Sequence, residues 1–309
     1  MNRRQFVAAS AGILAARPWS TVLNRSSSAR TRLILLGTAG GPRPQRQRAA
    51  CSQVILVNDS AYVVDCGDGV ARQLVSAGVP LTRLRHILIT HQHSDHNADY
   101  GNLMLLAWAV GLETRVDTWG PPPLGKMTRL FFEMNEYDIK VRRADEGHPP
   151  LTPLVHPHEI TRGGPVFSDA AVKVTATLVR HPLVQPAFAY RFDTADRSIV
   201  ISGDTVPSDN LIQLARGADV LVHEAMYLPA VDRIAARLPN APRLKEHLLA
   251  SHTSAEDAGR VAQAAGVKQL VLSHLVPPDD PTITDEMWIS AAQTHFRGPV
   301  IVGKDLLEV

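Results

Sequence analysis

The chain has 309 residues, of which about 45% are apolar and about 20% charged, a composition typical of globular domains and unlike that of disordered or fibrous chains. No apolar run reaches the ~20 residues that a membrane-spanning helix needs, so we expect no membrane insertion. The formal net charge is +2, but residues 1–30 contain five Arg and no acidic residue, which leaves 27 basic and 30 acidic residues in the remainder. A remainder of net charge −3 is unlike the basic surface of most nucleic-acid-binding proteins, so we expect no nucleic-acid partner.

The first thirty residues have the pattern of an export signal. Arg3 and Arg4 form a twin-arginine pair, and residues 7–16 are a short apolar segment that ends at Arg17 and Pro18. A positively charged start followed by an apolar segment too short to cross a membrane is typical of a signal peptide, and the alternative is a frayed amphipathic terminus. We predict a twin-arginine signal and linker over residues 1–30, one folded domain over residues 31–309, and a periplasmic or secreted protein.

Strands and helices are predicted to alternate along the rest of the chain. Apolar runs predict strands at residues 32–37, 53–58, 61–65, 86–90, 172–178, 188–192, 198–202, 220–223, 269–273 and 300–302. Helices are predicted at residues 70–77, 98–111, 211–216 and 285–295, with an inserted helical segment at 121–143 and a Pro-rich loop at 147–164. Thr253 and Glu256 fit a capping box that opens a further helix, which Gly266 ends. The alternation predicts a layered α/β domain.

The strongest chemical signal is a histidine-rich turn directly after the predicted strand 86–90. It contains His91, His93, Asp95 and His96, and neutral imidazoles with a carboxylate are good zinc ligands. The alternative is a solvated polar turn, although four ligand-type residues in this order seldom arise by chance. Neither Cys51 nor Cys66 lies in a zinc-binding spacing, and buried free thiols are favoured over a disulfide between them.

The HxHxDH pattern resembles the signature of the metallo-β-lactamase superfamily. Three more ligand-type residues follow in the order that this resemblance implies, each at the end of a predicted strand: His181, Asp204 and His274. The resemblance extends from about residue 32 to the end of the chain. It implies an αββα sandwich, in which two mixed sheets are flanked by helices and metals bind at one edge.

The resemblance also implies a role for each ligand residue. One Zn²⁺ would be bound by His91, His93 and His181, a second by Asp95, His96 and His274, and Asp204 would bridge them. Two such ions hold a hydroxide for attack, and Asp95 would also orient this nucleophile. Mn²⁺ or Fe²⁺ could replace zinc, and family members are often dimers, so a homodimer is compatible with the resemblance.

Two further motifs are similar to those of ribonuclease Z and related arylsulfatase-like or phosphodiesterase-like enzymes. They are His223-Glu224-Ala225 and His252-Thr253-Ser254-Ala255. In that branch His252 would protonate the leaving oxygen and Glu224 would orient His252, whereas the alternative places His252 in solvent at a helix start. Arg46 and Arg48 follow a Gly-rich loop and are candidates for binding a phosphate or sulfate, or are simply exposed.

These motifs predict a binuclear metallo-hydrolase that acts on a small-molecule substrate. Only 23 positions separate His181 from Asp204, an interval in which ribonuclease Z enzymes often have a tRNA-binding arm. Because that arm has no room here, we expect a small phosphodiester or sulfate ester as substrate. Hydrolysis of a β-lactam or a lactone is the alternative, and a metal-binding protein without catalytic activity is disfavoured by the proton-donor candidate.

Overall fold

The computed structural model describes residues 31–309, and two sheets form its centre. The first sheet has six strands in the order β1-β2-β3-β4-β5-β6, and the second has seven in the order β13-β12-β11-β10-β9-β8-β7. Both sheets are mixed: β1 to β3 pair antiparallel and β3 to β6 parallel, while β7 to β10 pair antiparallel and β10 to β13 parallel. The predicted signal segment lies outside the described residues.

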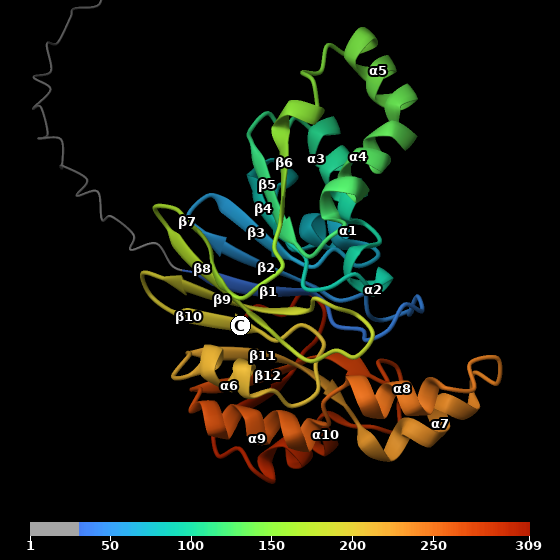
Figure 1. The fold of residues 1–309 in the computed structure, drawn as a ribbon, viewed down its shortest axis with the longest axis vertical. Coiled ribbons are helices and arrows are strands. Elements are labelled where there is room, and N and C mark those ends of the chain that lie inside the picture. Colours follow the sequence, from blue (N-terminus) through green and yellow to red (C-terminus); the bar gives the residue numbers. More distant parts are fainter. Residues whose placement is uncertain (1–30) are drawn as a thin grey trace, which may run out of the picture.

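The first sheet and its helices come from the N-terminal half of the described chain. Its strands are β1 (Arg32–Gly37), β2 (Ser52–Val57), β3 (Ser60–Val64), β4 (Leu84–Leu88), β5 (Val116–Gly120) and β6 (Val155–Glu159). The helices of this half are α1 (Val70–Ser76), α2 (Ser94–Asn97), α3 (Tyr100–Ala109), α4 (Leu124–Met134) and α5 (Glu136–Asp145). Helix α5 extends beyond the sheet at the top of Figure 1, whereas α4 packs against β6.

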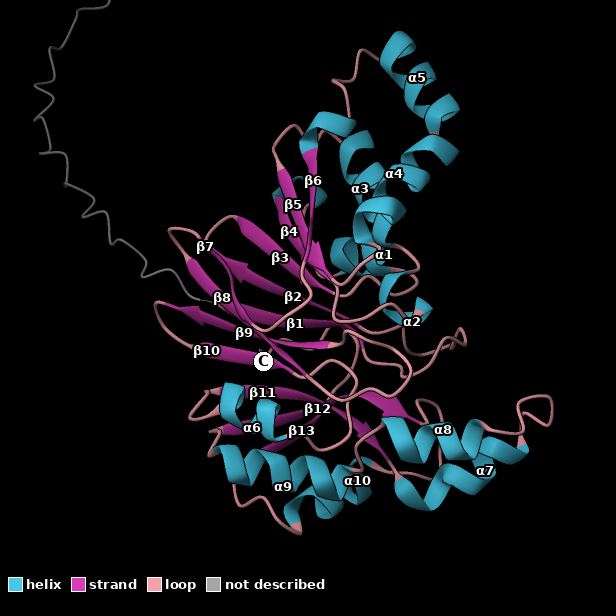
Figure 2. Cartoon of the chain, in the orientation of Figure 1, coloured by secondary structure: helices cyan, strands magenta, loops and turns pink. Residues whose placement is uncertain are grey.

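The second sheet contains the remaining strands. They are β7 (Gly164–Ser168), β8 (Val172–Leu178), β9 (Phe188–Thr194), β10 (Ser198–Ile201), β11 (Val220–Met226), β12 (Gln269–Val276) and β13 (Val300–Val302). Its helices are α6 (Asp209–Ala215), α7 (Val231–Ala236), α8 (Leu244–Ser251), α9 (Ala255–Ala265) and α10 (Asp285–Gln293). Figure 2 shows helices outside both sheets, with α7 and α8 set apart from α6, α9 and α10.

Three buried clusters hold these layers together. One lies between the sheets and includes Leu33 and Leu35 of β1, and Phe188 of β9. Ile34 and Leu36 point to the opposite face of β1 and pack in a second cluster with residues of α1 and α3. A third cluster lies under α6, α9 and α10. A strand buried on both faces must be apolar at successive positions, which explains why β1 is a continuous apolar run.

The predicted αββα sandwich is confirmed, but several elements differ from the prediction. Residues 147–164 are not simply a loop, because they contain β6, and β5 and β7 were not predicted. Helices α7 and α8 were also missed. The capping site of α9 is shifted by one position, since the Ser254 hydroxyl rather than that of Thr253 accepts the backbone N–H of Asp257. The helices of residues 31–309 are all too short or too polar to span a bilayer.

Candidate metal centre

The histidine-rich turn lies where β4 ends and α2 begins. The buried carboxylate of Asp65, at the end of β3, holds this turn in place: Oδ1 accepts the Thr90 N–H at 2.8 Å, and Oδ2 lies 2.7 Å from Nδ1 of His96. Because Asp65 occupies one ring nitrogen of His96, the other nitrogen, Nε2, is left to face the centre of the site. An imidazole fixed in this way is the usual arrangement of a metal-binding histidine.

One cluster of ligand-type atoms joins the turn to the second sheet. Nδ1 of His93 lies 3.1 Å from both Nε2 of His91 and Nε2 of His181, which follows β8. Oδ2 of Asp204, which follows β10, lies 3.8 Å from Nε2 of His91. The backbone carbonyl of Ser251 lies 3.2 Å from Nδ1 of His181 and so fixes that ring from behind.

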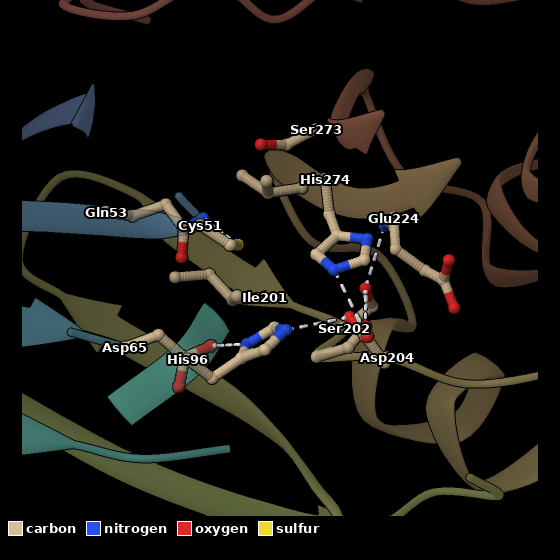
Figure 3. A pocket seen from close by; sticks show the side chains of 12 residues that line it. Cys51, Gln53, Asp65, His96, Ile201, Ser202, Asp204, Glu224, Ser273 and His274 are labelled. Carbon is tan, nitrogen blue, oxygen red and sulfur yellow. Dashed lines mark hydrogen bonds and ion pairs between the residues drawn. The ribbon is translucent and has the colours of Figure 1, made fainter. Parts of the chain in front are cut away.

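A second cluster adjoins the first and shares Asp204 with it. Nε2 of His96 lies 3.4 Å from Oδ1 of Asp204, and Nε2 of His274 lies 3.2 Å from Oδ2 of the same carboxylate. Oδ2 of Asp95 lies 3.6 Å from Nε2 of His96 and 3.3 Å from Nε2 of His274. Figure 3 shows the rings of His96 and His274 pointing toward Asp204 from two sides. All seven residues predicted as ligands therefore lie in two adjoining clusters.

His274 reaches its position through an irregularity in β12. Ser273 pairs with Glu224 of β11 and Leu275 with Ala225, so His274 is an extra, bulged residue with a φ of 45°. A bulge changes the direction of a side chain, and positive φ is uncommon in non-glycine residues. Gly40 leaves room for the ring, because a Cβ at that position would lie 2.8 Å from Nδ1 of His274.

The chemistry of the clusters fits divalent metal ions. Atoms that share a tetrahedral ion with bonds of about 2.0–2.1 Å are separated by roughly 3.3 Å, close to the distances above. Nε2 of His96 and Oδ1 of Asp204 are buried without a hydrogen-bond partner among the described residues. Burial holds the pKa of His91 well below its usual value, which keeps the imidazole neutral. Burial raises the pKa of Asp204, but the neighbouring His274 and His96 outweigh burial and keep the carboxylate ionised.

His252 and Glu224 form a hydrogen-bonded pair beside the clusters. Nδ1 of His252, which follows α8, lies 2.9 Å from Oε2 of Glu224, and Oε1 of Glu224 accepts the Thr205 N–H at 2.7 Å. Burial lowers the pKa of His252, but the charge and hydrogen bond of Glu224 raise it to about 9. Burial outweighs the charge of His252 and keeps the pKa of Glu224 above its usual value. Because Glu224 also accepts a backbone N–H, which favours the carboxylate, we assign the proton of the pair to His252.

The clusters open into a cavity of about 740 Å³. His93, Asp95, Asp204, His252 and His274 line its base, and residues of the loop after β1 and of α7 and α8 form its walls. His247 on α8 faces the base and was not predicted as a site residue; only its position five residues before His252 could have drawn attention to it.

The two predicted substrate-binding arginines lie away from this cavity. Arg48 donates to the hydroxyl of Thr38 and, at 2.7 Å, to the carbonyl of Gly303, so its guanidinium is used within the protein. Arg46 and Arg48 line a neighbouring surface pocket, which shares residues 42–45 of the loop with the cavity. Arg43 of the same loop, together with Arg237, lines the 740 Å³ cavity instead.

Comparison with known proteins identifies relatives over most of the chain. Residues 61–275 match the family model described as β-lactamase superfamily domain. Ribonuclease Z of Mycobacterium bovis (strain BCG / Pasteur 1173P2) is 34% identical over 280 residues, which cover 90% of this chain and 97% of that protein. Ribonuclease Z of Mycobacterium sp. (strain KMS) is 36% identical over 281 residues, which cover 90% and 95% of the two chains.

Solved structures show the same fold at lower identity. A metallo-β-lactamase fold protein from Bacillus subtilis superimposes with a TM-score of 0.66 at 22% identity, covering 90% of this chain and 98% of that chain. The short form of human tRNase Z superimposes with a TM-score of 0.65 at 21% identity, with the same coverage.

These relatives correct two predictions. A small phosphodiester or sulfate ester, with a β-lactam or lactone as the alternative, was the wrong substrate class, because the relatives that match 90% of the chain are named ribonuclease Z. For the same reason the expected absence of a nucleic-acid partner was wrong. The net charge sums over the whole chain and does not reveal that Arg43 and Arg237 line the cavity.

The short interval between His181 and Asp204, which argued against an RNA substrate, was equally misleading. It contains β9 and β10. A relative named ribonuclease Z nevertheless matches this chain along almost its whole length. The family match and the two clusters of His and Asp residues together support a metal cofactor and a hydrolase. The chain belongs to the β-lactamase superfamily and, within it, to the ribonuclease Z family.

Proposed function

We propose that this protein is a ribonuclease that hydrolyses a phosphodiester bond of RNA with two Zn²⁺ ions bound by the seven clustered residues. The observation that supports this most directly is the position of Asp204 between the clusters: its Oδ2 lies 3.8 Å from Nε2 of His91 in the first cluster and 3.2 Å from Nε2 of His274 in the second. His252 lines the same cavity. The names of the relatives supply the substrate class.

The proposed metal-binding roles follow from which ligand-type side chains lie together in each cluster. His91, His93 and His181 would bind one ion, Asp95, His96 and His274 the other, and Asp204 both. When bound, such ions lower the pKa of a water molecule and offset the negative charge that develops on the phosphate. Two other groups of ligand-type side chains contain Asp65 and Glu224. We assign no ion to them, because Asp65 already bonds to His96 and Glu224 to His252.

His252 and Glu224 would act on the leaving oxygen. As a water oxygen bonds to phosphorus, the bond from phosphorus to one bridging oxygen breaks, and that oxygen requires a proton. Glu224 occupies Nδ1 of His252, so the proton for transfer resides on Nε2, and Glu224 stabilises the charged ring before transfer. Arg43 and Arg237 lie where they can bind phosphates that flank the scissile bond.

The test is cleavage of RNA by the purified, zinc-loaded protein. We expect a tRNA precursor transcript to be cut to fragments with one phosphate end and one hydroxyl end, because water rather than the ribose 2′-hydroxyl attacks. A 2′-deoxy substitution at the cleaved nucleotide should therefore be tolerated, and no 2′,3′-cyclic phosphate should form. Asp204→Asn should abolish cleavage. Intact RNA after incubation with protein shown to contain two ions would refute the proposal.

A further inference from the structure

His247 lies at the point where the metal clusters meet the helical wall of the cavity. Its ring centroid is 5.6 Å from that of His252, 6.1 Å from that of His181 and 6.2 Å from that of His93. The ring planes differ by 90°, 63° and 73° respectively, so His247 meets all three imidazoles at steep angles rather than stacking on them. A group that reacts between the first cluster and His252 must therefore pass close to His247.

The hydrogen bonds of His247 leave one ring nitrogen without a protein partner. The hydroxyl of Ser251, one helical turn later on α8, lies 3.4 Å from Nδ1 of His247. When this hydroxyl donates to Nδ1, the ring proton resides on Nε2. Among residues 31–309 no hydrogen-bond partner is found for Nε2, and His247 lines the cavity. Its neutral imidazole thus has one N–H available for a molecule in the cavity.

The position of His247 indicates that it serves neither as a metal ligand nor as a packing residue of α8. None of the groups of ligand-type atoms in the described residues includes it, so it is not placed to bind an ion. Packing of α8 is provided by Leu248 and Ser251, which are buried, whereas His247 is only partly buried. An aliphatic residue would fill this place equally well if packing against the cavity wall were the only requirement.

We propose that His247 is a positioning residue for the substrate, with Nε2 donating a hydrogen bond to a non-bridging oxygen of the scissile phosphate. This inference rests on the proposed function, since it assumes a phosphodiester in the cavity. A non-bridging phosphate oxygen carries negative charge and accepts hydrogen bonds strongly. His247 lies on the helical wall beside the first cluster, so it would fix the phosphate from that wall while His252 protonates the leaving oxygen.

Three variants at two positions of α8 test this role. His247→Leu removes the donor but keeps an apolar side chain, and His247→Gln restores an N–H donor. Leu249→Gln is the matched control, since Leu249 is 46% exposed and does not line the cavity. A hydrogen bond to a charged group changes affinity by roughly 10- to 100-fold, so His247→Leu should lower kcat/KM for RNA by that factor. His247→Gln should recover most of the loss, and metal content should stay unchanged in all three variants.

Substitution of sulfur for one non-bridging oxygen identifies the contact itself. Sulfur accepts hydrogen bonds weakly, so one of the two phosphorothioate diastereomers should be cleaved more slowly by the wild type. That penalty should disappear in His247→Leu, because the bond is already missing, and should persist in Leu249→Gln. An equal penalty in wild type and His247→Leu would show that His247 does not contact the phosphate.

Binding of inorganic phosphate separates this inference from the proposed function. Calorimetry with the zinc-loaded protein should show weaker phosphate binding by His247→Leu than by the wild type or Leu249→Gln. If RNA is not cleaved but this difference is found, the proposed function fails and the phosphate-binding role of His247 stands. If the wild type cleaves RNA, and His247→Leu binds phosphate and cleaves RNA equally well, the role of His247 is refuted and the proposed function stands.

Discussion

Nδ1 of His252 lies 2.9 Å from Oε2 of Glu224, although the two residues are 28 positions apart and come from different elements. The pair is buried and adjoins the metal clusters, with Nδ1 of His252 only 3.9 Å from Oδ2 of Asp204. Such a pair holds a proton next to the place where a phosphodiester would be cleaved, and this arrangement makes the proposed proton transfer testable.

His252→Ala should lower the rate of cleavage by roughly 10²–10⁴-fold when the leaving atom is oxygen, because the alkoxide then departs without a proton. If sulfur replaces the leaving bridging oxygen, the loss should be much smaller, since a thiolate needs no proton to depart. The measurement is single-turnover cleavage of RNA with oxygen or sulfur at the 3′ or 5′ bridging position. Equal losses with oxygen and sulfur would rule out His252 as the proton donor.

The pKa of His252 should depend on Glu224. Burial lowers this pKa, but Glu224 raises it to about 9, so in the metal-free protein the ring stays protonated at neutral pH and loses its proton as the pH rises through about 9. Because the folded-state pKa is raised, the stability that the pair provides is present below the unfolded-state pKa of about 6.5 and is lost toward pH 9. Glu224→Gln should lower the pKa measured by NMR titration; an unchanged value would contradict the pairing.

Removal of individual ligand residues should change the metal content in a defined way. His181→Ala affects only the first cluster and His274→Ala only the second, so each should reduce the content from two ions per chain to about one. Asp204→Ala affects both clusters and should reduce it further. Elemental analysis after dialysis gives the ratios, and His156→Ala, far from the clusters in β6, is the control. Two ions retained by Asp204→Ala would refute its shared role.

The export signal predicted for residues 1–30 can be tested by its effect on where the protein accumulates. Because twin-arginine export depends on the arginine pair itself, replacing Arg3 and Arg4 with Lys should retain the protein in the cytoplasm. Cell fractionation and immunoblotting of wild type and variant measure this directly. Delivery of the double variant outside the cytoplasm at wild-type levels would show that residues 1–30 are not such a signal.

The sequence by itself predicted the parts of the site that depend on local order. His91, His93, Asp95 and His96 fall within six residues after a strand, so a single turn brings them together. The continuous apolar run of Arg32–Gly37 and the alternating pattern of Val172–Leu178 both predicted strands with their observed ends. Helices α7 and α8 were not predicted because they are short and pack in a small separate cluster with Met226 and Val276, which gives no long periodic signal.

The tertiary structure decided which charged residues face the cavity. Arg46 and Arg48 were chosen by their place in the loop, but Thr38 and Gly303 bond to the guanidinium of Arg48, and Gly303 is 255 positions away in the chain. Arg43 and Arg237 face the cavity instead. The substrate class was predicted wrongly for a related reason, since a net charge gives the sum of the charges without their positions.

The directions of single side chains also depend on contacts between distant segments. The sequence placed His274 at a strand end, but only the pairing of β12 with β11 creates the bulge that turns its ring toward Asp204. His247 was not predicted as a site residue, and only the packing of α8 beside the clusters places it in the cavity. The sequence thus determined the alternation of strands and helices and the ligand types, because these follow from local patterns. The αββα arrangement was implied by the resemblance of the HxHxDH pattern to the metallo-β-lactamase superfamily. The geometry of the cavity was decided by the tertiary structure, because it is set by strand pairing and helix packing between residues far apart in the chain.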